Sequence, residues 1–409
     1  MAVLAFLASV ANYASTVIFS RILTPAGFGD LTALLVLAVV LAVPTGAAQT
    51  VIAERIAGLS AEGHTDRIRF LIRHALGHVV AIGLLVAGIY TVCIPLVVAV
   101  LNLEGPGPAI ALAPVIALAF VQPLALGVLQ GLDRFTAFGA MLLAIAICRI
   151  AFGAPWAALP IGGAGGAIAG QGLGMALCLV GAGWILREHL MARGTGAATS
   201  GVRRRPNLRT ISASAAFVAF ALISNLDVLL AKLFLTADEV GQYAALATIG
   251  KIVTFLPASV AVVMVPNAAR ARHSRAASLR VLRIAAVLVA ATALIAALPA
   301  ALAPELAVRV MFGDQYLAAA AGVLPIVVAG SVLAVLYLLV VYTVAIEDRH
   351  WTRLLLLGIV LQVVGTALFH ESPAQVAMVQ AFAVSVVLMV NEGGFHSLLP
   401  LRERARATD

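Results

Sequence analysis

Charged side chains interrupt several of the long apolar stretches in this chain of 409 residues. The basic ones are Arg21, Arg149, Lys232 and Lys251, and Asp227 is the one clear acidic one. A charge at the centre of a bilayer costs about 2.5 to 3.5 kcal/mol on insertion scales, so such residues usually face a water-filled cavity or a partner. Fixed cations suit an anionic ligand. A buried carboxylate suits either a structural ion pair or the uptake of a proton or a sodium ion.

Depth in the membrane separates the four cations into two pairs. Counting the helical rise from the ends predicted to be cytoplasmic places Arg149 and Lys251 near the middle of the bilayer. Arg21 and Lys232 fall near the outer edge, where a long side chain can also extend to the outer headgroups. Arg149 and Lys251 cannot reach water in that way, so we expect a cavity or a buried ion pair around them.

Two asparagines, Asn12 and Asn225, also lie within apolar stretches. An amide there either bonds to a neighbouring helix or binds a sugar hydroxyl, and the interhelical bond is the commoner use. Asn225 and Lys232 are seven residues apart and would share one face of a continuous helix. We therefore predict that the stretch around Asn225, Asp227 and Lys232 carries function.

The composition predicts a membrane protein. Hydrophobic residues make up 63% of the chain and charged residues only 11%, which is too apolar for a soluble protein of this length. The apolar runs are long and contain scattered Gly and Pro, which favours helices over the short alternating strands of an outer-membrane barrel. The fold class predicted is an all-α polytopic membrane protein.

About twelve transmembrane helices are expected, and the loops between them alternate in charge. Arginines crowd the loops after even-numbered spans and the C-terminal tail, so the positive-inside rule places both termini in the cytoplasm. A bacterial inner membrane is the expected location. The predicted spans are 2–22, 31–53, 75–101, 109–131, 137–158, 164–186, 210–235, 241–265, 284–303, 321–346, 354–370 and 375–399.

The sequence of the first helical hairpin has a match in the second half of the chain, which predicts an internal repeat. Thr24, Gly29, Ala33 and Leu34 match Thr236, Gly241, Ala245 and Leu246 at one constant offset. With six spans in each half, both halves enter the membrane from the same side, as parallel repeats do. The predicted domains are a six-helix bundle over 1–195, a basic cytoplasmic linker over 196–209 and a second six-helix bundle over 210–409.

Other sequence features support a structural interpretation. Cys93, Cys148 and Cys178 lie in apolar runs without CxxC spacing, so no metal or disulfide is expected. The glycine-rich run 162–174 permits close helix packing, and it is a weak candidate for a phosphate loop because no strand precedes it. Residues 269–283 could form a basic amphipathic helix on the inner face. No cofactor and no nucleic-acid partner are expected.

Four segments together carry a resemblance to a known family: NYASTVIFSRILTPAGFGDLTAL, LQGLDRFTAFGAMLLAIAICRI, SNLDVLLAKLFLTADEVGQYAAL and VMFGDQYLAAAAGVLPIV. In order and spacing they resemble the polysaccharide transporters, the O-antigen and exopolysaccharide flippases of the multidrug, oligosaccharidyl-lipid and polysaccharide exporter superfamily. The resemblance covers essentially the whole chain. The chain departs from the family in starting almost at its first span, and in having twelve apparent spans where some relatives have fourteen.

The resemblance implies two six-helix bundles forming a V around a central cavity that opens alternately to the two membrane faces. It implies outward movement of a polyprenyl-pyrophosphate-linked oligosaccharide, with Arg21, Arg149, Lys232 and Lys251 as candidates for a cationic cavity. Polar candidates for sugar contact or coupling are Asn12, Tyr13, Gln122, Asn225 and Asp227. Membrane lipids and a glycan polymerase or glycosyltransferases are the expected partners.

Three other functions remain open at this point. A drug or metabolite exporter of the same superfamily would need cavity carboxylates, but buried cations outnumber the single clear buried carboxylate. A membrane-embedded enzyme, such as a glycan polymerase, would need catalytic clusters in a large loop, and the outer loops here are short. A scaffold without transport activity also fits the sequence. We therefore expect a transporter and not an enzyme.

Overall fold

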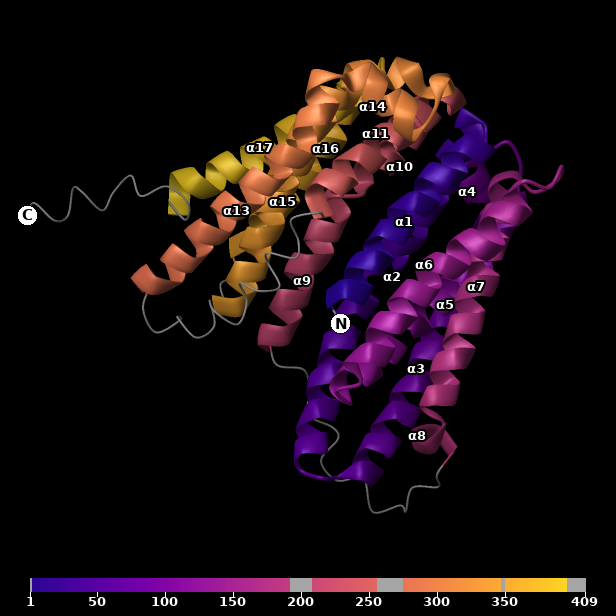
Figure 1. The fold of residues 1–409 in the computed structure, drawn as a ribbon, viewed down its shortest axis with the longest axis vertical. Coiled ribbons are helices and arrows are strands. Elements are labelled where there is room, and N and C mark those ends of the chain that lie inside the picture. Colours follow the sequence, from indigo (N-terminus) through magenta and orange to yellow (C-terminus); the bar gives the residue numbers. More distant parts are fainter. Residues whose placement is uncertain (1, 192–207, 256–274, 347–349, 396–409) are drawn as a thin grey trace, which may run out of the picture. The chain divides into compact units, whose positions relative to one another are not determined.

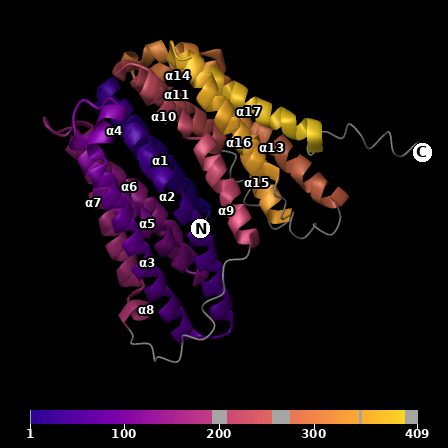
Figure 2. The same ribbon diagram turned by 180° about the vertical axis from the view of Figure 1, so that it is seen from behind.

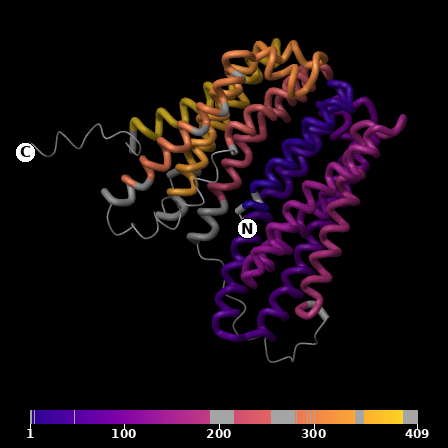
Figure 3. The backbone as a smooth tube through the Cα atoms, in the orientation of Figure 1, coloured from indigo at the N-terminus to yellow at the C-terminus, as the bar shows by residue number. Residues whose placement is uncertain are grey.

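The computed structural model describes residues 2–191, 208–255, 275–346 and 350–395 (Figure 1). The chain divides into two compact units, Met1–Thr210 and Ile211–Asp409. Every element in the described ranges is a helix, which confirms the predicted all-α class. Most of the predicted linker 196–209 lies outside these ranges, as do residues 269–274 of the basic segment 269–283. Figure 3 traces the same backbone with the remaining residues in grey.

Unit 1 is a bundle of long antiparallel helices, and Figure 2 shows it from behind. Connections of only a few residues join successive helices, so the helices alternate in direction. Its elements are α1 (Ala2–Ile22), α2 (Pro25–Ala61), α3 (Thr65–Val92), α4 (Ile94–Val100), α5 (Gly107–Gly131), α6 (Phe135–Ala157), α7 (Gly163–Ile185) and α8 (Arg187–Met191).

Glycines allow α7 to pack tightly on α6. A Cβ atom added at Gly174 would lie 2.7 Å from the Cβ of Cys148, and one added at Gly170 would overlap the Phe152 carbonyl. These two glycines are four residues apart and therefore lie on one face of α7, as in other small-residue helix contacts in membranes. The glycine-rich run acts in helix packing, as the sequence indicated.

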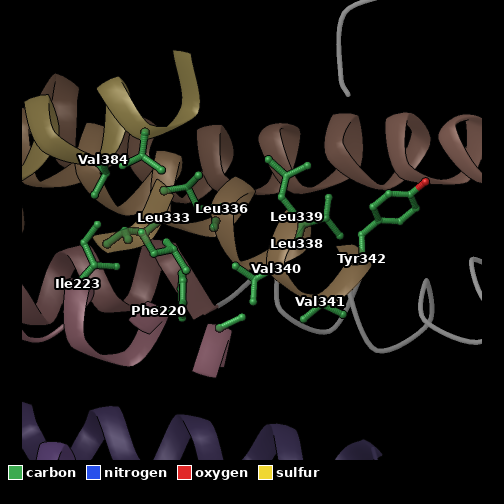
Figure 4. Close-up of a cluster of buried hydrophobic side chains, with 14 of the residues drawn as sticks. Phe220, Ile223, Leu333, Leu336, Leu338, Leu339, Val340, Val341, Tyr342 and Val384 are labelled. Atoms are coloured by element: carbon green, nitrogen blue, oxygen red, sulfur yellow. The ribbon is translucent and has the colours of Figure 1, made fainter. Parts of the chain in front are cut away.

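Unit 2 contains α9 (Leu208–Ile223), α10 (Leu226–Phe234), α11 (Ala237–Phe255), α13 (Arg275–Leu302), α14 (Pro304–Met311), the 3-10 helix η2 (Asp314–Gly322), α15 (Val323–Ile346), α16 (His350–Leu368) and α17 (Pro373–Phe395). α15 is its central helix, since it packs against α11, α13 and α17. Figure 4 shows part of the resulting core, in which Phe220 of α9, Leu333 of α15 and Val384 of α17 gather together.

Large apolar side chains also cover the outside of both units. Leu85, Val180, Ile295 and Phe382 are all more than 60% exposed. In water such a surface would be unfavourable, whereas in a bilayer it is matched to lipid chains. Nine helical stretches in the described ranges are long and apolar enough to span a membrane, and Arg353–Leu368 is a shorter apolar helix.

Two predicted spans are not continuous. The third, 75–101, is interrupted at Cys93, where α3 ends and α4 begins with Pro95 in its first turn. The seventh, 210–235, breaks at Ser224 and Asn225 between α9 and α10. Each of these two predicted spans consists of two helices, because apolar composition reports membrane depth and not backbone continuity.

Candidate functional site

In unit 1, Arg149 of α6 bonds to Asn12 of α1. The Nη1 atom of Arg149 donates to Oδ1 of Asn12 over 2.7 Å, and the guanidinium lies 5.8 Å from the ring centre of Phe19. The Nε atom of Arg149 is buried and has no hydrogen-bond partner. Within the described part of the chain, the partners of this cation are thus a neutral amide and an aromatic face, and no carboxylate neutralises it.

A second unpaired donor lies nearby in unit 1. The Nε2 atom of Gln171 on α7 is buried without a partner, and its Cγ atom faces Gly153, one turn beyond Arg149 on α6. An unpaired buried donor costs about 1 to 3 kcal/mol, so the surroundings of Arg149 favour a ligand that accepts hydrogen bonds.

The other sequence candidates in unit 1 are Arg21, Tyr13 and Gln122. Arg21 is exposed near the end of α1, nine residues beyond Asn12, or roughly 14 Å along the helix axis. Tyr13 and Gln122 are half-buried, on α1 and α5. The exposed position of Arg21 fits a side chain that extends toward headgroups better than one that lines the same site as Arg149.

In unit 2, Asp227 of α10 is the centre of a buried polar cluster. Its side chain is 2% exposed. The Tyr243 hydroxyl on α11 donates to Asp227 Oδ2 over 2.8 Å and lies 3.4 Å from Oε1 of Gln380 on α17. The second carboxylate oxygen, Oδ1, is buried and has no hydrogen-bond partner. A proton or a small cation would satisfy that oxygen.

The break between α9 and α10 positions this carboxylate. Asn225 lies at the break and caps α9, since its Nδ2 atom donates to the carbonyl of Ala221 over 2.8 Å. Gln362 of α16 bridges the break when its side-chain amide is oriented so that both its nitrogen and its oxygen form hydrogen bonds. The nitrogen then donates to the Ile223 carbonyl over 3.3 Å, and the oxygen accepts from the Asp227 N–H over 3.3 Å. Asp227 therefore occupies the first turn of α10, where the helix dipole favours negative charge.

Lys251 faces the same cluster from α11. It lines a small cavity together with Asp227, Thr254 and Gln380, and its charge attracts that of Asp227. The cavity has room for roughly one water molecule. The structure thus brings together Asp227 and Lys251, which the sequence had suggested separately.

Lys232 is buried, and Asn225 lies at the break between α9 and α10. Lys232 is only 2% exposed, so its side chain does not extend into the outer headgroups. Asn225 does not lie inside a continuous helix, and the predicted shared face with Lys232 is lost at the break. The break carries no sequence signal, because neither Gly nor Pro lies at Ser224 and Asn225.

Sequence reasoning missed several polar residues that complete the cluster. Gln362 and Gln380 are each 3% exposed or less, and Tyr243 is fully buried. A glutamine within an otherwise apolar span is itself a signal, because an amide in hydrocarbon needs a partner.

In unit 1, the structure also brings the Sγ atoms of Cys148 and Cys178 to 3.8 Å, which their spacing of 30 residues did not suggest. Among the described residues, no group of three His, Cys, Asp or Glu side chains could hold a metal ion.

These features define a polytopic helical protein with buried polar clusters within its spans, one of which lies at a broken helix. Broken helices beside ion or substrate sites are typical of secondary transporters. No family model and no curated protein matches the chain in sequence.

Several solved structures of membrane transporters have a similar fold. The chain is similar to an inward-facing multidrug resistance MATE family transporter of the MOP superfamily, with a TM-score of 0.70, 14% identity and coverage of 98% of this chain and 95% of the other. It is similar to the lipid II flippase MurJ in its inward closed conformation, with a TM-score of 0.71, 11% identity and coverage of 96% and 86%. An outward-facing MATE transporter matches with a TM-score of 0.58, 15% identity and coverage of 99% and 93%.

Proposed function

We propose that this protein is a flippase that moves a polyprenyl-pyrophosphate-linked oligosaccharide from the cytoplasmic to the outer leaflet by alternating access, for synthesis of a cell-surface polysaccharide. The observation that carries the proposal is Arg149, a cation within a predicted span that no described carboxylate neutralises. A pyrophosphate brings negative charge into a region of low dielectric, and a fixed cation there lowers its barrier.

The residues around Arg149 suit this role. Asn12 accepts one guanidinium hydrogen bond and thereby orients the side chain, which leaves other donors for a phosphate. Gln171 adds an unpaired amide donor close by. The lipid tail of the substrate would remain in the bilayer, where the exposed apolar faces of the helices meet the acyl chains. The similarity of the fold to a lipid II flippase supports this substrate class.

The Asp227 cluster is proposed to couple transport to an ion gradient. Its unpaired Oδ1 atom would take up a proton or a sodium ion, and Lys251 would compete with that cation for the carboxylate. Tyr243, Gln362 and Gln380 would hold the carboxylate in place through the cycle.

The same cluster favours one alternative, which is export of a drug or metabolite. A buried carboxylate attracts organic cations, and the fold is also similar to multidrug transporters. The two functions differ in the site that matters most: Arg149 for an anionic lipid-linked substrate, and Asp227 for a cationic drug.

Charge reversal in cells tests the proposal. Arg149→Glu and Lys251→Glu are each expected to abolish the appearance of lipid-linked glycan in the outer leaflet, with protein levels checked by immunoblot. Arg309→Glu is the matched control, because Arg309 is exposed on α14 and pairs with Asp314 over 2.8 Å. Normal glycan export by both span variants at normal protein levels would refute the flippase assignment. Loss of drug resistance in Asp227→Asn, with glycan export intact, would establish the exporter instead.

A further inference from the structure

Three basic side chains from different elements of unit 1 converge where α7 leads into α8. Arg69 is on α3, Arg134 immediately precedes α6, and His189 is on α8, which packs against α3 and α7. α8 lies beside α3 in both views of the ribbon (Figures 1 and 2). Arg134 bonds to the Ile185 carbonyl just before α8, and burial together with the charges of Arg134 and Arg69 lowers the pKa of His189.

The hydrogen bonds of this group, which we call the α8 cluster (Arg69, Arg134 and His189), leave donors unused. Nη1 of Arg134 donates to the Ile185 carbonyl over 3.1 Å at the end of α7. Nε of Arg69 is a buried donor without a partner, and Nδ1 of His189, which donates or accepts according to the ring tautomer, is also buried without a partner. An N–H donor that is both charged and unpaired is unfavourable, and an anion bound between these side chains would relieve it.

Nearby carboxylates do not neutralise the α8 cluster. Asp66 pairs with Nη1 of Arg69 over 3.2 Å, but it is 61% exposed and water weakens the pair. Glu188 raises the pKa of His189 less than burial and the two arginines lower it. Arg134 bonds to a backbone carbonyl and to no described carboxylate. A net positive charge therefore remains on the cluster.

The position of the cluster indicates the source of the anion. It lies at the end of the apolar span of α7, beside Trp184, whose side chain is 69% exposed and stacks under the guanidinium of Arg187 at 4.7 Å. Exposed tryptophans and arginines at the end of a span mark the depth of the lipid headgroups. Planar guanidinium groups bind phosphate oxygens in pairs, and basic pockets between helices at this depth bind anionic headgroups.

We propose that Arg69, Arg134 and His189 form a binding site for a phosphate group, carried by the headgroup of an anionic phospholipid in the adjacent leaflet. The site is separate from the Arg149 and Asp227 clusters and does not depend on the transported substrate. Its occupant would cross-link α3, the start of α6 and α8, and so stabilise unit 1.

The test uses the purified full-length protein in detergent, with dioleoyl phosphatidylglycerol as the probe. Native mass spectrometry counts the bound lipids, and thermal unfolding measures the stabilisation. The wild-type protein is expected to bind phosphatidylglycerol and to melt at a higher temperature in its presence, while dioleoyl phosphatidylcholine has little effect. Arg69→Gln or Arg134→Gln is expected to weaken binding about tenfold or more, because a hydrogen bond between charged groups is lost.

Arg67→Gln is the matched control, since it removes the same charge two residues from Arg69 on α3. It is expected to leave the affinity unchanged. Arg134→Gln removes the hydrogen bond that Arg134 donates to the Ile185 carbonyl and can therefore destabilise the fold. Arg69→Gln leaves that bond in place, so it tests the site even if Arg134→Gln folds poorly. Equal losses in Arg67→Gln and Arg69→Gln would overturn the site in favour of general surface charge. Full stabilisation by millimolar inorganic phosphate alone would overturn the assignment to a lipid headgroup.

Discussion

Replacing Arg149 with glutamine should separate transport from folding. The variant loses a hydrogen bond of 2.7 Å to Asn12 from a charged donor and a guanidinium contact of 5.8 Å with Phe19. These are worth about 1.5 to 3 kcal/mol and about 0.5 to 2 kcal/mol. Removing a charge from the centre of a span returns about 2.5 to 3.5 kcal/mol on insertion scales. The terms nearly cancel, so we expect a melting temperature close to that of the wild-type protein.

Transport by the same variant should fall sharply, because a neutral amide cannot offset the charge of a pyrophosphate. We expect at least tenfold slower appearance of lipid-linked glycan in the outer leaflet, measured in cells with matched protein levels. Arg149→Lys should retain part of the activity, since it keeps the charge but not the planar donor group. Wild-type export by Arg149→Gln would refute the reasoning, and Arg309→Gln, which neutralises an exposed arginine on α14, provides the control.

Three further predictions concern stability, each measured by thermal unfolding in detergent. Tyr243→Phe should lower the free energy of unfolding by about 1 to 3 kcal/mol, because Asp227 loses its hydroxyl donor; an unchanged melting temperature would contradict the hydrogen bond. Gly174→Ala should cost about 1 to 3 kcal/mol by overpacking the contact with α6, whereas Gly181→Ala on the same helix, where the added methyl meets open space, should change little. His189 has a lowered pKa, so without bound anion the folded state binds fewer protons than the unfolded state and loses stability as the pH falls through and below about 6.5. His189→Gln should remove this part of the pH dependence, and an identical pH profile in the variant would count against it.

The membrane class and most helices followed directly from the sequence. Long apolar runs predict spans because a backbone in hydrocarbon must satisfy its own hydrogen bonds, and the structure is helical throughout its described ranges. The glycine-rich run was correctly interpreted as a packing surface, since Gly170 and Gly174 both face α6. The apolar pattern did not locate the two breaks, where Cys93 and Asn225 separate consecutive helices within a predicted span.

The candidate site followed from the sequence only in part. Arg149, Lys251 and Asp227 were identified because a charge in an apolar run is conspicuous, and the predicted depth of Arg149 remains a prediction. Tyr243 and the buried glutamines were missed, because a tyrosine or a glutamine is individually tolerable in a span and becomes informative only when a partner is known. The α8 cluster was also missed, because its members are 65 and 55 residues apart along the chain and become informative only when the structure brings them together.

The sequence alone therefore determined that the chain is a helical membrane protein with charges in its spans, since burial in hydrocarbon constrains each residue individually. The tertiary structure decided which charges act together. Asp227 meets Tyr243, Gln380 and Lys251 only because α9 breaks before it and α11 and α17 pack against α10. Arg149 meets Asn12 across 137 residues because α1 packs on α6. Such pairings depend on which helices are neighbours, and hydropathy, which measures residues one at a time, carries no information about that.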